Sequence, residues 1–179
     1  MANDSSYIPY ARQHLDEDDI NAVSEVLRSD YLTTGPAVDK FEAKLAEICG
    51  AKYAISCSSG TAALHLSAMA LNLGPSDKVI VPSITFLSTA SAARYLGAEV
   101  IFADVDANTG LMTSDTFEEA IHRGEADIKA AFPVHLAGQS PNMPELATIS
   151  QNKNITIVDD ACHAIGASYS YSNKQTLVG

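Results

Sequence analysis

YAISCSSGTAALHLSAMA, residues 53–70, carries the clearest indication of the fold. Its first five residues are an apolar run typical of a buried strand, and the Ala and Leu residues of its second half predict a helix. Ser58, Ser59, Gly60 and Thr61 lie between the two. The first backbone N–H groups of a helix have no partner inside the helix, so they attract a phosphate. This turn is therefore a candidate phosphate-binding site.

The same turn has a simpler interpretation. A Ser or Thr before an apolar helix is often an ordinary N-cap, whose side chain satisfies a backbone donor and binds no ligand. The sequence contains neither the G-x-G-x-x-G dinucleotide fingerprint nor the G-x-x-x-x-G-K-[ST] P-loop, so no standard nucleotide motif explains the turn. Other parts of the chain must therefore decide between the two interpretations.

The composition is that of a globular protein. The chain has 179 residues, of which 46% are hydrophobic and 18% charged, and this is enough apolar material for one substantial core. The formal net charge is −11, with no basic run to offset it. This charge argues against binding of nucleic acid or of an anionic membrane by broad electrostatic attraction. An anionic ligand would need backbone dipoles and a few local cations.

The sequence shows no targeting segment. No apolar run reaches the roughly 18 residues of a membrane span, and the opening MANDSSYIPYARQ lacks the apolar region of a secretory signal. We therefore expect a cytoplasmic protein. Cys49, Cys57 and Cys162 include no C-x-x-C pair, which favours free structural thiols over disulfides or a metal site.

Two helices are expected before residue 53. Residues 1–15 show no period, because Pro9 and mixed polarity interrupt it. Residues 15–30 combine an acidic start with an apolar face, which predicts the first helix. Pro36 suits the first turn of a second helix, which Gly50 closes.

Beyond residue 53, strand and helix patterns alternate. Apolar runs that are each followed by a helical stretch indicate buried parallel strands joined by right-handed crossovers. The pattern predicts an α/β fold, a three-layer sandwich with a mostly parallel sheet flanked by helices. The expected strands are 53–57, 78–82, 99–103, 128–132 and 155–158, and the expected helices are 60–73, 86–96, 114–122 and 144–152.

The loops that follow these strands should meet, because ligands of such sheets bind outside the carboxyl ends of the strands. They read SSGT after 53–57, PSITFLST after 78–82, PVHLAG after 128–132 and DDACHA after 155–158. Within them Phe86 offers a flat apolar face and His163 a hydrogen-bond donor. Because side chains alternate along a strand, one of Asp159 and Asp160 can point into the cleft.

A carboxylate at this place could bind a metal, act as a base, or pair with a protonated ring nitrogen. A phosphate site, a stacking plane and a carboxylate together match the needs of pyridoxal 5′-phosphate (PLP). Simpler roles stay open for the same residues. Phe86 could belong to the core, His163 could be a satisfied helix histidine, and Asp159 could be a capping or structural carboxylate. His135 could be a polar residue of the strand end or a cleft residue.

Several runs of the sequence together resemble one known family. They are IPYARQHLDEDDINAVSEVLRSDYLTTGP, FEAKLAEICGAKYAISCSSGTAALHLS, VPSITFLSTASAARYLGAEVIFADVDANTG, PVHLAGQ and IVDDACHAIGASY. Over nearly the whole chain they resemble the DegT/DnrJ/EryC1/StrS family of sugar aminotransferases. These are fold-type-I PLP enzymes that place an amino group on a nucleotide-linked keto sugar. The opening run is similar to the nucleotide-linked dideoxysugar 4-aminotransferases of surface-glycan synthesis.

The resemblance implies a set of cofactor-binding residues, which are Ser59, Gly60, Thr61, Phe86, Asp160 and His163. The first three would hold the cofactor phosphate, and Phe86 would stack on the ring. Asp160 would pair with the pyridine nitrogen, and His163 would lie near the ring hydroxyl.

The resemblance also implies a domain organisation. Residues 1–35 would form an N-terminal segment and helix, in which Thr33, Thr34 and Gly35 fall where the family contacts the sugar. Residues 36–179 would form part of the PLP-binding large domain. Family members continue into a lysine that forms a Schiff base with the cofactor and then into a smaller C-terminal domain. The chain is therefore expected to lack this lysine and that domain.

None of the lysines in the sequence matches the family position. Lys174 lies in a stretch that predicts a hairpin turn, and Lys52, Lys78, Lys129 and Lys153 stand near the starts of strands, at the opposite edge of the sheet from the cleft. The expected consequence is that the chain alone does not transaminate, because that lysine forms the Schiff base and moves the proton.

Three interpretations follow. The chain could be a truncated aminotransferase that is inactive alone, a non-catalytic oligomerising or ligand-binding module derived from that fold, or one half of a two-chain enzyme. The expected partners are further copies of the chain, as a dimer or larger oligomer, and by family a nucleotide sugar and an amino donor.

Overall fold

The computed structural model describes residues 12–172 and 174–178, so most of the segment expected to be irregular, residues 1–15, lies outside the described part. By its internal contacts the chain divides into two units, Met1–Phe41 and Glu42–Gly179. The first unit contains α1 (Glu17–Arg28) and the start of α2 (Pro36–Cys49). Both helices begin close to where the sequence predicts them.

The start of α1 is fixed by a capping box. The Asp16 carboxylate accepts hydrogen bonds from the backbone N–H groups of Asp18 and Asp19, at 3.0 and 3.1 Å. The Asp19 carboxylate accepts the N–H of Asp16 in return. Acidic side chains at this end also interact favourably with the helix dipole, which explains why the acidic run begins a helix.

The second unit is the expected α/β sandwich. Its parallel sheet has the strand order β2-β1-β3-β4. The elements after α2 are α3 (Gly60–Ala70), β1 (Lys78–Pro82), α4 (Leu87–Arg94), β2 (Glu99–Ala103), α5 (Ser114–Gly124), β3 (Ile128–Ala131), the 3-10 turn η1 (Leu136–Gly138), α6 (Met143–Lys153), β4 (Thr156–Ile157), β5 (Ser168–Tyr171) and β6 (Lys174–Leu177).

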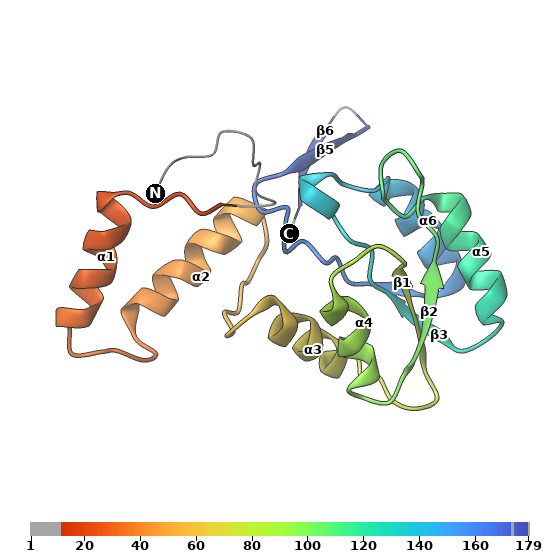
Figure 1. Ribbon diagram of the computed structural model, residues 1–179, viewed down its shortest axis with the longest axis horizontal. Coiled ribbons are helices and arrows are strands. Elements are labelled where there is room, and N and C mark those ends of the chain that lie inside the picture. Colours follow the sequence, from red (N-terminus) through yellow and green to blue (C-terminus); the bar gives the residue numbers. More distant parts are fainter. Residues whose placement is uncertain (1–11, 173, 179) are drawn as a thin grey trace, which may run out of the picture. The chain divides into compact units, whose positions relative to one another are not determined.

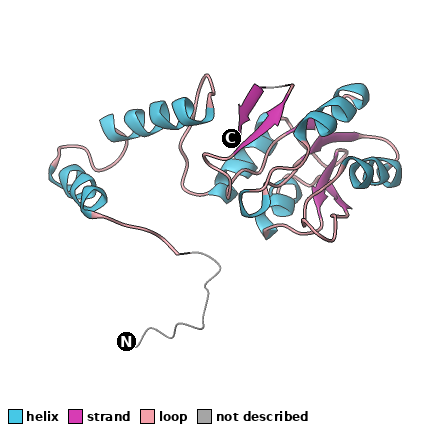
Figure 2. Cartoon of the chain, turned by 90° about the horizontal axis from the view of Figure 1, so that it is seen from above, coloured by secondary structure: helices cyan, strands magenta, loops and turns pink. Residues whose placement is uncertain are grey.

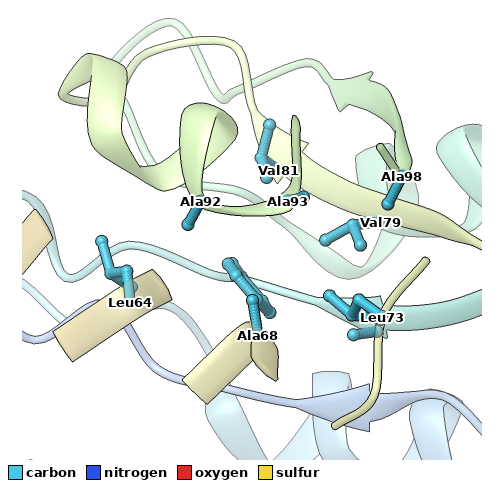
Figure 3. Close-up of a cluster of buried hydrophobic side chains, with 10 residues drawn as sticks. Leu64, Ala68, Leu73, Val79, Val81, Ala92, Ala93 and Ala98 are labelled. Atoms are coloured by element: carbon cyan, nitrogen blue, oxygen red, sulfur yellow. The ribbon is translucent and has the colours of Figure 1, made fainter. Parts of the chain in front are cut away.

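Side-chain alternation along β1 builds a core on each face of the sheet. Val79 and Val81 point toward Leu64 of α3 and Ala92 of α4 (Figure 3). Ile80, between these two valines, belongs to the cluster on the opposite face, with side chains of α5 and α6. Helices α3 and α4 therefore lie on one side of the strands and α5 and α6 on the other, which gives three layers (Figure 1).

The expected strand at 53–57 is wrong. These residues form no strand, and no strand of the described part of the chain pairs with them. Ile55 is 82% exposed. A strand exists only where a neighbouring backbone completes its hydrogen bonds, and an apolar run cannot show whether that neighbour is present. The segment is held instead by Glu42, whose carboxylate accepts the backbone N–H and the hydroxyl of Ser56, both at 2.7 Å.

The hairpin expected near Lys174 is confirmed. β5 and β6 pair in antiparallel fashion and form a sheet of their own, separate from the parallel strands (Figure 2). β4 is shorter than expected, but its direction continues in an isolated parallel bridge between Val134 and Asp160. Among the described residues, no helix is both long and apolar enough to cross a membrane.

Candidate functional site

A hollow of about 200 Å³ lies where the loops after β1, β3 and β4 meet the start of α3. Its walls come from all four predicted loops, and its lining residues are Gly60, Thr61, Thr85, Phe86, Ser88, Val134, Leu136, Asp160, Cys162 and His163. Five of the six predicted cofactor residues therefore lie around one hollow. Ser59 is the sixth, and it is not among the lining residues.

The turn before α3 combines the two interpretations that its sequence allows. Ser59 is the N-cap, and its hydroxyl oxygen accepts the N–H of Ala62 at 3.1 Å. The backbone N–H groups of Gly60 and Thr61 have no acceptor within the helix, because they belong to its first turn. These two residues line the hollow and offer it donors at the positive end of the helix dipole.

Gly60 allows a close approach between two walls of the hollow. A Cβ atom at this position would lie 2.8 Å from Sγ of Cys162, which is closer than a carbon and a sulfur tolerate. A side chain at position 60 would therefore require the Cys162 thiol to rotate away, or the start of α3 and the loop after β4 to separate.

Phe86 is a surface aromatic residue. It precedes α4 as its N-cap residue, without a side-chain capping bond, and it is 71% exposed. Its alternative assignment to the core is therefore wrong. An aromatic face held at the mouth of a hollow can stack on a planar ring.

Asp160 is a buried carboxylate, only 5% exposed, on the floor of the hollow. One oxygen, Oδ2, accepts the hydroxyl of Thr89 at 2.6 Å, and the other, Oδ1, accepts the N–H of Cys162 at 3.3 Å. Its backbone is held as well, because its N–H donates to the carbonyl of Pro133 at 2.9 Å and its carbonyl accepts the N–H of His135 at 3.1 Å. The carboxylate is thus fixed from several sides.

Asp159 and His135 lie away from the hollow. Neither lines it, and the His135 side chain is fully buried with Nε2 3.6 Å from Oδ2 of Asp159. This arrangement favours the structural interpretation of Asp159 and the strand-end interpretation of His135. His163 lines the hollow from a turn, so its alternative as a helix histidine is wrong.

Sequence reasoning missed the hydroxyl groups of the loop after β1. Thr85 and Ser88 line the hollow, and Thr89 bonds Asp160. The signal that could have revealed them is the presence of three hydroxyl residues within positions 85–89, directly after a buried strand, because ligands bind outside the carboxyl ends of such strands. Cys162 was considered only as a structural thiol, yet it also lines the hollow.

The lysines of the second unit lie outside this site. In the described part of the chain no lysine lines the hollow. Lys78 Nζ donates to the carbonyl of Gly124 at 2.9 Å, and Lys129 Nζ donates to the carbonyl of Asn72 at 2.7 Å. Lys174 begins β6.

The pKa of the Cys162 thiol is raised to about 11. Burial is the largest cause, followed by the hydrogen bond to Asp160 and the negative charge of Asp160. The thiolate is the form that reacts with alkylating reagents, so at pH 9 only about 1% of Cys162 should be reactive. Cys162 is partly exposed, so access does not prevent the reaction.

Asp160→Asn should therefore accelerate alkylation of Cys162. Removing the charge lowers the thiol pKa, and each unit of decrease raises the thiolate fraction at pH 9 by about tenfold. The rate can be measured with iodoacetamide by mass spectrometry of the Cys162 peptide, so that Cys49 and Cys57 do not interfere. Asp159→Asn is the matched control and should leave the rate unchanged. Equal rates in both variants would show that Asp160 does not act on the thiol.

The predicted sugar-contact residues belong to the first unit. Thr33, Thr34 and Gly35 line a separate hollow of about 500 Å³ together with residues of α1 and α2. Thr34 has a φ of +46° and Gly35 a φ of +127°. The left-handed conformation is unfavourable for threonine, and strained positions of this kind concentrate at functional loops.

Comparison with solved structures gives close similarity at the level of fold. An aminotransferase from Psychrobacter cryohalolentis is 31% identical, with a TM-score of 0.82 over 90% of this chain and 40% of its own. The PLP form of a Streptococcus pneumoniae protein described as a sugar aminotransferase is 31% identical, with a TM-score of 0.82 over 90% of this chain and 44% of its own. NtdA from Bacillus subtilis, with bound pyridoxamine phosphate (PMP), is 35% identical, with a TM-score of 0.77 over 84% and 34%.

The chain thus spans between 34% and 44% of the length of these three proteins. The expectation of PLP as the family's cofactor is confirmed, because relatives have been solved in PLP and PMP forms. Residues 13–176 match the sequence pattern of one family along nearly the whole chain. The chain belongs to the DegT/DnrJ/EryC1/StrS aminotransferase family.

Proposed function

We propose that this chain supplies the part of a PLP-dependent sugar aminotransferase that holds the cofactor's phosphate and ring. The observation that carries the proposal is the convergence of the start of α3, Phe86 and Asp160 on one hollow. These three features come from distant parts of the sequence, and each offers a different kind of contact. A phosphorylated, planar, nitrogen-containing ring requires all three at once.

The residues of the hollow fit this cofactor. The N–H groups of Gly60 and Thr61 would donate to its phosphate, at the helix end where the dipole favours negative charge. Phe86 would cover one face of the ring, and His163 would lie near the ring hydroxyl. Bound PLP supplies an electron sink, and its ring accepts electrons best when the nitrogen is protonated. Asp160 would hold that proton at the ring nitrogen, because a buried carboxylate pairs strongly with a cation.

We further propose that the substrate is a nucleotide-linked keto sugar, as in aminosugar and surface-polysaccharide synthesis. Thr33, Thr34 and Gly35 would contact the sugar from the loop between α1 and α2. The domain division expected from the sequence, at residue 35, belongs to the same proposal. So does a cytoplasmic location, where nucleotide sugars are made and used.

The Schiff-base lysine would come from outside these 179 residues. The proposal is supported by the lining of the hollow, which includes no lysine from the described residues. The 179-residue chain is then expected to bind PLP without a covalent link and to have no transaminase activity by itself.

The test is to add PLP to the purified 179-residue chain and record its absorbance before and after borohydride reduction. We expect binding, visible as a change in the cofactor spectrum, that is lost on dialysis even after reduction. A stable adduct after reduction, mapped to a lysine by mass spectrometry, would show that a lysine of this chain does reach the cofactor. Complete absence of PLP binding would contradict the proposal itself.

A non-catalytic assembly module is the second candidate. It is favoured by the unpaired segment 53–57 and by the exposure of Ile55, because uncovered apolar backbone of this kind invites pairing with another polypeptide. Self-association in light scattering, together with no binding of PLP, would favour this function. The same surface would suit a second chain that supplies the lysine.

A further inference from the structure

We propose that two hydrogen bonds in series, from Thr85 to Thr89 and from Thr89 to Asp160, position the Asp160 carboxylate. They leave the Thr85 oxygen as a second acceptor for a protonated ring nitrogen. This inference rests on the proposed function, since it concerns how the same site recognises its ring. Thr89 acts through Asp160 and is a positioning residue. Thr85 lines the hollow and would touch the ligand.

The two hydrogen bonds between Thr85, Thr89 and Asp160 are short. Thr89 Oγ1 lies 2.6 Å from Oδ2 of Asp160 and 2.7 Å from Oγ1 of Thr85. Thr89 is fully buried, and Asp160 is nearly so. Short hydrogen bonds between buried oxygens are strong, and a buried hydroxyl without a partner would be costly. Thr89 is therefore committed to these two bonds.

The direction of both hydrogen bonds follows from the number of protons available. An ionised carboxylate only accepts, so Thr89 donates its single hydroxyl proton to Asp160. The oxygen of Thr89 must then accept from Thr85, because it has no second proton to give. The hydroxyl proton of Thr85 is then used in its bond to Thr89. Toward the hollow, the Thr85 hydroxyl can therefore act only as a hydrogen-bond acceptor.

The consequence is that Asp160 and Thr85 both offer acceptors to the hollow and that neither threonine of the pair offers it a donor. Asp160 and Thr85 both line it, so a ligand N–H placed between them would be satisfied, whereas an unprotonated nitrogen would face oxygen lone pairs. The site would thus select the protonated form of the ring. Selection would depend on Thr89, which has no contact with the ligand but holds the carboxylate in place.

The backbone of Cys162 acts on the other oxygen of the Asp160 carboxylate. The Cys162 N–H bonds Oδ1, and the Cys162 thiol stays protonated to high pH. His163 lines the same hollow, and the Asp159 and His135 side chains face each other away from it. α3 contributes Gly60 and Thr61 and no charged side chain to this hollow.

The experiment uses pyridoxine 5′-phosphate, which lacks the aldehyde and so cannot form a Schiff base. We expect Thr89→Val to weaken its binding about tenfold, the lower end of the cost of one hydrogen bond to a charged group, and to reduce the ring-protonated fraction in the ultraviolet spectrum of the bound ligand. Thr89→Ser should restore both values to within about twofold. Thr85→Val should also weaken binding several-fold, and Thr85→Ser should not.

A measurement without ligand tests the direction of the two hydrogen bonds. A buried hydroxyl proton of Thr89 that donates to Asp160 should give a slowly exchanging proton NMR resonance, which Thr85→Val retains. Loss of that resonance in Thr85→Val would show that Thr89 donates to Thr85 instead, and would overturn the inference. Equal binding by the wild type and Thr89→Val would overturn it as well. If no variant and no wild-type sample binds the ligand, the proposed function fails, and the resonance still decides the order of the hydroxyls.

Discussion

Gly60→Ala is expected to weaken binding of pyridoxine 5′-phosphate by roughly 10- to 100-fold, the equivalent of losing one hydrogen bond to a charged group. The physical reason is the short distance between two walls of the site. An added Cβ would lie 2.8 Å from Sγ of Cys162, so the thiol has to rotate away, or the start of α3 and the loop after β4 have to separate. Either change alters the wall of the hollow to which Gly60 and Cys162 both belong. Isothermal titration calorimetry measures the loss directly.

The cause can be isolated by a second substitution. Cys162→Ala removes the sulfur but keeps its Cβ, which would lie at an acceptable 3.9 Å from the new methyl group. The double variant, Gly60→Ala with Cys162→Ala, should therefore recover most of the affinity, and Cys162→Ala alone should bind as the wild type does. A double variant as weak as Gly60→Ala would mean that the glycine matters for another reason. Circular dichroism of each variant shows whether the fold is intact.

Phe117→Ala should lower the free energy of unfolding by about 3 to 5 kcal/mol, the range for truncating a fully buried aromatic side chain. Phe117 of α5 is 1% exposed and belongs to the same buried cluster as Ile80 of β1 and Met143 and Leu146 of α6. The cavity left by its ring would open between the sheet and two helices, where the neighbouring side chains cannot collapse fully.

Phe102→Ala is the matched control, because it removes the same ring from a residue that is 50% exposed on β2. We expect it to cost less than about 1 kcal/mol, as is usual for partly exposed positions. Both values can be measured by urea unfolding followed by circular dichroism. Similar costs for the two substitutions would contradict the position of the core between β1, α5 and α6.

The sequence predicted those parts of the fold that depend on local pattern. The strands 78–82 and 99–103 appear with the expected bounds, because apolar runs between turn signals identify buried strands. The convergence of the loops was also predictable, because the carboxyl ends of parallel strands meet at the same edge. Gly60, Phe86 and Asp160 were therefore brought together as expected.

The sequence could not predict features that depend on a neighbour distant along the chain. Residues 53–57 have the pattern of a strand, but only the three-dimensional structure shows that they are unpaired. The bond between Thr89 and Asp160 joins residues 71 positions apart. The closeness of Gly60 to Cys162 is another such case, since a glycine in the first turn of a helix gives no sign of the sulfur that lies beside it.

The attachment of residues 53–57 through Glu42 makes the turn that leads into α3 sensitive to acid. The hydrogen bonds from the backbone and then the hydroxyl of Ser56 lower the pKa of the Glu42 carboxyl. A lowered pKa means that the attachment is fully present above the ordinary glutamate range and weakens only as the pH falls through the lower value. The segment leading to Gly60 should therefore lose this attachment in acid, whereas the backbone hydrogen bonds of the parallel strands involve no titratable side chain.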